Sequence, residues 1–188
     1  MRRAIVAGIL FGLTGPSAAG SIDVLARTCN ACHGLNGVSV GHTMPSIGGL
    51  SKRYLSTVMK DWKTDKRSAV TMNRIVKGLS DDEIDALALY YSKLPWVPTP
   101  QPVGAATLAA GRAVVNENCE DCHGKTGSDP DVGAPKLNGQ WARYMTLELE
   151  KYRHPDFRMP HRKMRKAARD LKEAEVQPVA EYYGAQDK

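Results

Sequence analysis

Two short stretches decide the fold of this chain: Cys29-Asn30-Ala31-Cys32-His33 and Cys119-Glu120-Asp121-Cys122-His123. Each is a Cys-x-x-Cys-His motif, and together they use all the cysteines of the sequence. Two thiols three positions apart near a helix end can each form a thioether with one vinyl group of a porphyrin, and the histidine that follows can ligate the iron. The sequence therefore predicts two covalently bound haem c groups, attached through Cys29, Cys32, Cys119 and Cys122 and ligated by His33 and His123.

Two other uses of these cysteines stay open at this point. Paired Cys-x-x-Cys motifs can form a four-thiolate zinc site, and an even number of cysteines in an exported protein can form disulfides. The two motifs lie 90 residues apart, and neither zinc nor a disulfide explains a histidine directly after each second cysteine. The histidines therefore favour haem.

The chain contains an internal repeat. A shift of 90 positions places the first motif on the second, and it also places Pro45 on Pro135, Gly49 on Gly139 and Tyr54 on Tyr144. A repeated unit of this length indicates a duplicated domain. Because four prolines in the segment 95–102 cannot continue a helix, we expect an extended, semi-rigid connector there.

These observations predict a domain organisation. We expect a signal peptide at residues 1–19, a first domain at 20–94, a proline-rich linker at 95–103 and a second domain at 104–188.

The repeat also selects candidates for the sixth iron ligand. Later in each copy the shift becomes 92, and Met72 then falls on Met164, each 18 residues before a pair of tyrosines. A thioether opposite histidine raises the potential of a haem, as in electron-carrying cytochromes. We therefore expect His33 with Met72 and His123 with Met164 as axial pairs. Met159 and His161 lie in the same short stretch as Met164, so either could replace it.

The coarse pattern is all-α. Ser80 and Glu83 form a capping box, and the apolar residues that follow have helical spacing. Pro178 would interrupt the equivalent helix of the second copy, so we expect the last helix to begin there. The other helices are expected at Asp23–Ala31, Leu50–Trp62, Leu108–Asn118, Gln140–Tyr152 and Lys163–Glu175.

The N-terminus has the three parts of a secretory signal. Arg2 and Arg3 precede an apolar run over residues 4–13, and small residues follow at 17–20. The run is too short to span a bilayer, which needs about 20 apolar residues. We therefore expect a periplasmic protein without a stable membrane span.

Charge excludes one class of partner. The formal net charge is +6, but Arg2 and Arg3 lie in the expected signal, and the propionates of two haems would offset most of the remainder. Nucleic-acid binding is therefore not expected. Six basic residues do gather in the segment 158–169, which is either a solvated helix face or a docking surface for an acidic partner. They are Arg158, Arg162, Lys163, Arg165, Lys166 and Arg169.

At these residues the chain resembles dihaem cytochromes c, with two tandem cytochrome c-like haem domains. One similar family is the free-standing periplasmic carrier of the c-four type. The cytochrome subunit of flavocytochrome c sulfide dehydrogenase looks closer, through residues 30–34, 71–78, 139–141 and the basic stretch around Met164. This similarity covers nearly all of residues 22–184.

This second resemblance implies a periplasmic electron-transfer subunit rather than an enzyme on its own. It implies a heterodimer with a separate flavoprotein subunit that carries FAD and oxidises sulfide, and an external electron acceptor such as a small cytochrome c. The third alternative, an independent haem enzyme, needs an open or specially ligated iron, and two methionine ligands would close both irons.

Overall fold

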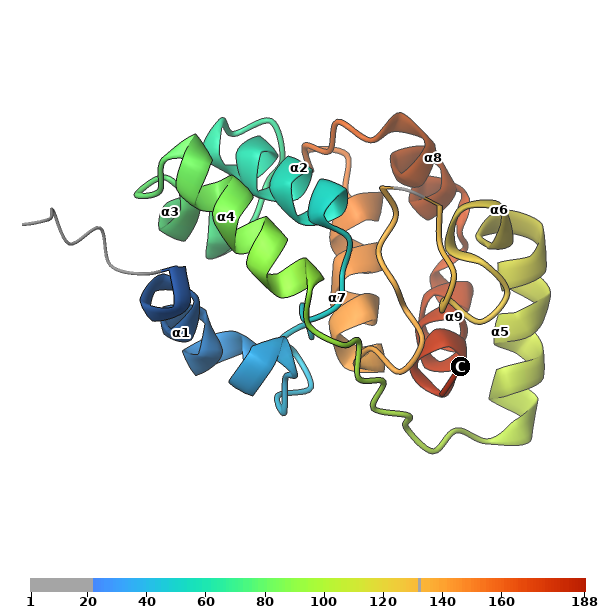
Figure 1. Ribbon diagram of the computed structural model, residues 1–188. Coiled ribbons are helices and arrows are strands. Elements are labelled where there is room, and N and C mark those ends of the chain that lie inside the picture. The colour runs from blue at the N-terminus through green and yellow to red at the C-terminus, as the bar shows by residue number, and fades with distance from the viewer. Residues whose placement is uncertain (1–21, 132) are drawn as a thin grey trace, which may run out of the picture.

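The computed structural model describes residues 22–131 and 133–188, and the regular structure of these residues is helical. The first half contains α1 (Ile22–His33), the 3-10 helix η1 (Leu35–Gly37), α2 (Lys52–Lys63), α3 (Met72–Val76) and α4 (Asp81–Ser92). The second half contains α5 (Ala105–Asn118), α6 (Glu120–His123), α7 (Ala142–Arg153), α8 (Arg162–Asp170) and α9 (Glu173–Gly184). Figure 1 shows the two groups of helices next to each other, joined by one irregular segment. The all-α prediction is confirmed, and the expected signal peptide lies outside the described residues.

Two of the helix starts follow from serine capping residues. The Ser80 hydroxyl accepts a hydrogen bond from Glu83 N at 3.1 Å, and Glu83 Oε2 accepts one from Ser80 N at 2.7 Å, so the predicted capping box opens α4. Ser51 caps α2 by accepting from Tyr54 N at 3.1 Å. The expected helices at Asp23–Ala31, Leu50–Trp62, Leu108–Asn118 and Gln140–Tyr152 are confirmed, with ends shifted by a few residues.

The prediction for the last two helices was wrong at their shared boundary. The helix expected at Lys163–Glu175 ends at Asp170, and α9 begins at Glu173 instead of Pro178. Leu171 and Lys172 are extended, with ψ of 134° and 153°, and they separate the two helices. Glu175 Oε2 then accepts a hydrogen bond from Lys172 N at 2.8 Å, which satisfies a donor at the new helix start.

Pro178 lies inside α9 and is tolerated because of tertiary packing. Its ring nitrogen cannot donate to the carbonyl of the preceding turn, but α9 buries one face in the second core, including Val176, Val179 and Tyr183. α5 crosses α9 closely at Gly111, where an added Cβ would lie 2.2 Å from the Pro178 carbonyl oxygen. The close crossing therefore requires glycine on α5.

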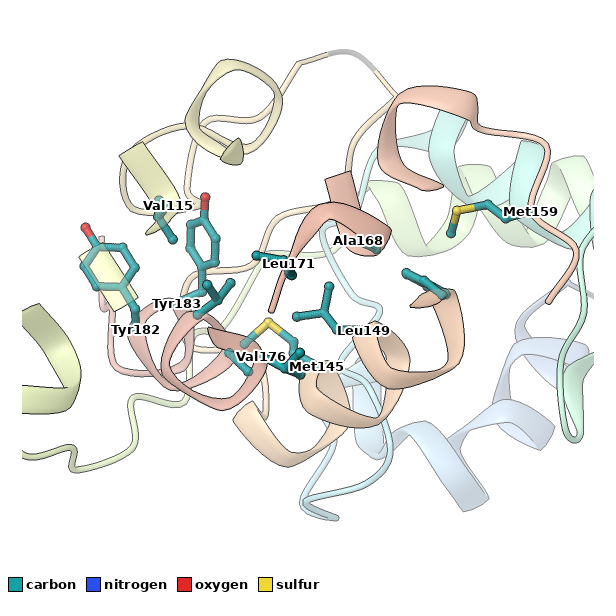
Figure 2. Close-up of a cluster of buried hydrophobic side chains, with 12 residues drawn as sticks. Val115, Met145, Leu149, Met159, Ala168, Leu171, Val176, Tyr182 and Tyr183 are labelled. Atoms are coloured by element: carbon teal, nitrogen blue, oxygen red, sulfur yellow. The ribbon is translucent and has the colours of Figure 1, made fainter. Parts of the chain in front are cut away.

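Each half has its own hydrophobic core. The first core joins α1, α2 and α4, and the Tyr91 hydroxyl donates to the Ala26 carbonyl at 2.8 Å to fasten α4 onto α1. The second core joins α5, α7, α8 and α9, and Figure 2 shows its side chains. There the Tyr183 hydroxyl donates to the Gly124 carbonyl at 3.1 Å. Tyr91 and Tyr183 thus each fasten the last helix of their half to the segment that carries the attachment motif.

The two halves are also joined by hydrogen bonds. The connector lies along the second half, where Thr99 N donates to the Gly139 carbonyl at 2.9 Å and Trp96 Nε1 donates to the Asn138 carbonyl at 3.0 Å. Gly49 and Gly139 have φ of 79° and 63°, and an added Cβ on either would lie within 2.5 Å of the connector backbone. The same glycine in both copies therefore lets the connector pass close to each half.

Candidate haem sites

The attachment motifs lie at helix ends in both halves. Cys29, Cys32 and His33 belong to the last turns of α1, whereas Cys119 separates α5 from α6, which ends at His123. All four thiols are unpaired, so the disulfide alternative is not supported. Within residues 22–131 and 133–188, no three His, Cys, Asp or Glu side chains come together as a metal cluster, so the two thiol pairs are not brought together in the arrangement that the alternative zinc site requires.

Each motif histidine is held in one orientation by a proline carbonyl. His33 Nδ1 lies 2.9 Å from the Pro45 carbonyl oxygen, and His123 Nδ1 lies 3.2 Å from that of Pro135. A carbonyl can only accept a hydrogen bond, so Nδ1 carries the proton in both rings. Nε2 therefore keeps its lone pair, which is the atom that an iron would bind.

The environment also keeps both imidazoles neutral. Burial lowers the pKa of His33 below its usual value, against the hydrogen bond to Pro45. Burial likewise lowers the pKa of His123, and the nearby His161 lowers it further. Neutral imidazole is the form that ligates metals, so both rings are prepared as ligands at neutral pH.

The internal repeat aligns Pro45 with Pro135, but the sequence alone gives neither proline a role. Both lie 12 residues after their histidine, and their carbonyls select the tautomer of the ring. The equal separation in both copies was the available signal.

Each hydrophobic core includes a candidate methionine. Met72 is the first residue of α3 and is half-buried against the first core, and Met164 lies in α8, half-buried against the second core. Met159 is 2% exposed and lies within the second core. In Figure 2 it lies beyond Ala168, at the opposite end of the core from Tyr183, whose ring centroid is 6.4 Å from that of His123. His161 caps α8 through Nδ1, which accepts from Met164 N at 3.2 Å.

The first half exposes apolar side chains that its own core does not cover. Leu35, Val70 and Ile75 are 74%, 75% and 50% exposed, and they flank the first motif and Met72 in the sequence. Exposed apolar side chains next to the attachment motif and Met72 in the sequence are available to contact an apolar group. Together with the paired thiols and the free Nε2 atoms, they fit a planar apolar group that carries iron, so the residues present match haem c.

A cluster of aromatic and basic side chains lies at the junction of the halves. Arg67 is 9% exposed, its Nη2 donates to the Tyr152 hydroxyl at 2.6 Å, and its guanidinium lies over the Trp62 ring at 6.0 Å. Trp62 Nε1 is buried and has no hydrogen-bond partner within the described residues. Among the described residues, no carboxylate forms an ion pair with Arg67. Sequence reasoning missed Arg67, because it has no arginine counterpart at the 90-residue shift.

α8 carries a segregated positive charge. The segment 158–169 holds six basic residues and no acidic residue, whereas the remainder of 104–188 holds eight basic and thirteen acidic residues. Lys166 pairs with Asp170, and Arg169 donates to the Pro155 carbonyl at 3.0 Å. Arg162 and Lys163 are exposed at the start of the helix and make no ion pair within the described residues. We call the six residues of this segment the α8 basic surface.

Two sequence families match the chain, one in each half. The family described as "Cytochrome c" matches residues 18–95, and the family described as "Cytochrome C oxidase, cbb3-type, subunit III" matches residues 106–182. No helix within the described residues is long and apolar enough to cross a membrane.

Curated relatives include three kinds of cytochrome. The thiosulfate dehydrogenase electron acceptor of Stutzerimonas stutzeri is 30% identical over 87% of this chain and 81% of its own length. The cytochrome c4 of Azotobacter vinelandii is 32% identical over 81% of this chain and 83% of its own length. The cytochrome subunit of sulfide dehydrogenase of Chlorobaculum tepidum is 33% identical over 48% of this chain and 88% of its own length.

Solved structures give the same fold. The structure of reduced cytochrome c4 from Pseudomonas stutzeri has a TM-score of 0.75 and 25% identity, and the match covers 88% of this chain and 96% of that one. A thiosulfate dehydrogenase from Marichromatium purpuratum has a TM-score of 0.71 and 25% identity over 84% of this chain and 36% of that one. The chain therefore belongs to the dihaem cytochrome c family and is an electron carrier of the cytochrome c4 type, built from two tandem cytochrome c domains.

Proposed function

We propose that this dihaem cytochrome accepts electrons from a partner dehydrogenase that oxidises a reduced sulfur compound, and passes them singly to an external acceptor such as a small cytochrome c. The observation that carries the electron-transfer role is the recurrence of one donor set in both halves: two thiols, a neutral histidine with Nδ1 tied to a proline carbonyl, and a half-buried methionine. The similarity to a thiosulfate dehydrogenase electron acceptor over most of both chains supports the sulfur-linked partner.

The roles of individual residues follow from this proposal. Cys29 and Cys32 would hold one haem c in a domain at 20–94, and Cys119 and Cys122 the other in a domain at 104–188, with 95–103 as the linker. Residues 1–19 would direct the chain to the periplasm. Each haem supplies an iron that takes up and releases one electron, and the axial pairs would be His33 with Met72 and His123 with Met164.

Three observations support Met164 over its neighbours. Met159 is enclosed by the second core, at the end away from Tyr183 and His123. Met164 is only partly buried, so its thioether has fewer packing constraints. The side chain of His161 already caps α8, because its Nδ1 accepts a hydrogen bond from Met164 N at 3.2 Å.

The axial ligands can be tested by near-infrared absorption of the oxidised protein, which contains a methionine-to-iron band. Met72→Ala and Met164→Ala should each remove one of two contributions to this band, because each deletes one thioether ligand. Met159→Leu is the matched control, since leucine has a similar volume and should leave the band intact. His161→Asn, which keeps a helix-capping side chain, should also leave it intact. A full band in Met164→Ala, or a reduced band in either control, would reject the assignment.

The donor has two candidates. The sequence resemblance implies a flavoprotein subunit that carries FAD and oxidises sulfide, and the sulfide dehydrogenase cytochrome subunit is similar to about half of this chain. Thiosulfate dehydrogenase is the second candidate, because the related electron acceptor aligns with 87% of this chain.

The donor can be identified by isolating the protein from its source periplasm under mild conditions and recording mass and visible spectrum before and after each substrate. A heavier complex that contains flavin and is reduced by sulfide would establish the sulfide-oxidising flavoprotein. A heavier complex reduced by thiosulfate would establish thiosulfate dehydrogenase. A flavin-free protein of the mass of this chain, reduced by neither, would contradict the proposal and leave a free-standing carrier.

The α8 basic surface is our candidate for docking an acidic partner, since opposite charges accelerate encounter between redox proteins. Arg162→Glu with Lys163→Glu should slow association with the partner roughly tenfold at low salt, with little effect at 0.5 M salt. These positions begin α8, where acidic residues favour the helix dipole, so the helix should persist.

The matched control for this test is Arg112→Glu with Lys93→Glu. It makes the same charge change at exposed positions outside α8. Stopped-flow reduction at several salt concentrations measures the rates. Equal rates in the two double variants would show that net charge, and not the α8 basic surface, steers the partner.

A further inference from the structure

A side chain of the second half holds the loop of the first half that contains Pro45 and Ser46. We call this loop the proximal loop, because its Pro45 carbonyl accepts the hydrogen bond from His33. Gln140 Oε1 accepts a hydrogen bond from Ser46 N at 3.0 Å, and Gln140 Nε2 donates to the Ser46 carbonyl at 3.0 Å. Both residues are 3% exposed. Because both the oxygen and the nitrogen of the Gln140 amide bond the same residue, they fix the position of the Ser46 backbone.

The Ser46 N–H belongs to the same peptide group as the Pro45 carbonyl, which accepts the hydrogen bond from His33 Nδ1 at 2.9 Å. The atoms therefore form a continuous chain from the His33 ring, through the Pro45–Ser46 peptide, to the Gln140 amide. Hydrogen bonds in such a chain polarise one another, so a peptide whose N–H is bonded has a stronger carbonyl acceptor.

The second half has no equivalent chain. The corresponding peptide joins Pro135 to Lys136, and Lys136 N has no hydrogen-bond partner within the described residues. The repeat shift of 90 places Gln140 on Leu50, whose side chain is buried in the first core. The first half therefore has no side-chain amide that could bond the Pro135–Lys136 peptide. The distance from His123 Nδ1 to the Pro135 carbonyl oxygen is also longer, at 3.2 Å.

We infer that Gln140 is a positioning residue for the first haem: it polarises the Pro45–Ser46 peptide, strengthens the hydrogen bond at His33 Nδ1, and makes the potential of that haem depend on the second domain. The inference rests on the proposed ligation of iron by His33. A stronger hydrogen bond at Nδ1 makes the imidazole a better donor, and a better donor favours oxidised iron. Gln140 therefore lowers the potential of the first haem and leaves the second unaffected.

The test is a spectroelectrochemical titration of the holoprotein. Gln140→Leu, which installs the residue found at the matching position of the first copy, should raise the midpoint potential of one haem only. That haem should be the one whose potential also changes in Met72→Ala. The NMR signal of the His33 Nδ1 proton should move upfield in Gln140→Leu, as expected for a weaker hydrogen bond, while the His123 signal stays in place.

Two further variants separate polarisation from loop anchoring. Trp141→Phe removes the bond from Trp141 Nε1 to the Ser39 carbonyl, 3.0 Å, which anchors the same loop without touching the Pro45–Ser46 peptide, and it should leave both potentials unchanged. Gln140→Glu keeps an acceptor for Ser46 N, so it should not raise the midpoint potential of the first haem. This variant tests the inference if Gln140→Leu folds poorly.

An unchanged first-haem potential in Gln140→Leu, a rise in Gln140→Glu, or an equal shift in Trp141→Phe would overturn the inference. The proposed sulfur-linked partner plays no part in these measurements, so its failure is seen separately, in the isolation experiment. If the isolated protein carried no haem at His33, both the inference about Gln140 and the proposed function would be overturned. The visible spectrum would show this before the titration.

Discussion

The hydrogen bond from a buried histidine to a proline carbonyl is the constraint on which each half is organised. It fixes the imidazole ring and leaves Nε2 available, so it decides where an iron can be bound. The loop that supplies the carbonyl is held in turn by the last helix of its own half, because Gly49 N donates to the Tyr91 carbonyl and Gly139 N to the Tyr183 carbonyl, both at 2.9 Å. Tyr91 and Tyr183 therefore hold the loop that positions the histidine, and their side chains also belong to the cores.

The two halves are copies that have become different at their junction. The second half contributes Gln140 and Trp141 to the proximal loop of the first, where the first copy has Leu50 and Ser51. The second half also carries the α8 basic surface, whereas the matching α3 of the first half is short and contains one basic residue, Arg74. On our proposals, the first haem is tuned across the junction, and the second half meets the partner.

Sequence alone predicted the features that depend on local chemistry. The capping box at Ser80 and the helical spacing of apolar residues predicted most helices, and the attachment motifs and the repeat marked the two candidate haem sites. Pro178 misled the prediction because its cost to α9 is offset by burial and by the close crossing at Gly111, which are tertiary effects. Gln140 and Arg67 were missed because their partners, Ser46 and Tyr152, lie 94 and 85 residues away in the sequence. No local pattern marks a contact of that separation.

The most direct test of the central claim is the number of haems covalently attached to the chain. Intact-mass spectrometry of the unfolded protein, isolated from its source, should give the mass of the chain plus two haems, and substitution of both cysteines in either motif should remove one. The absorption spectrum of the unfolded chain should retain both haems, because thioether bonds survive denaturation. A mass with one haem or none, or with free thiols at Cys29 and Cys32 or at Cys119 and Cys122, would contradict the account.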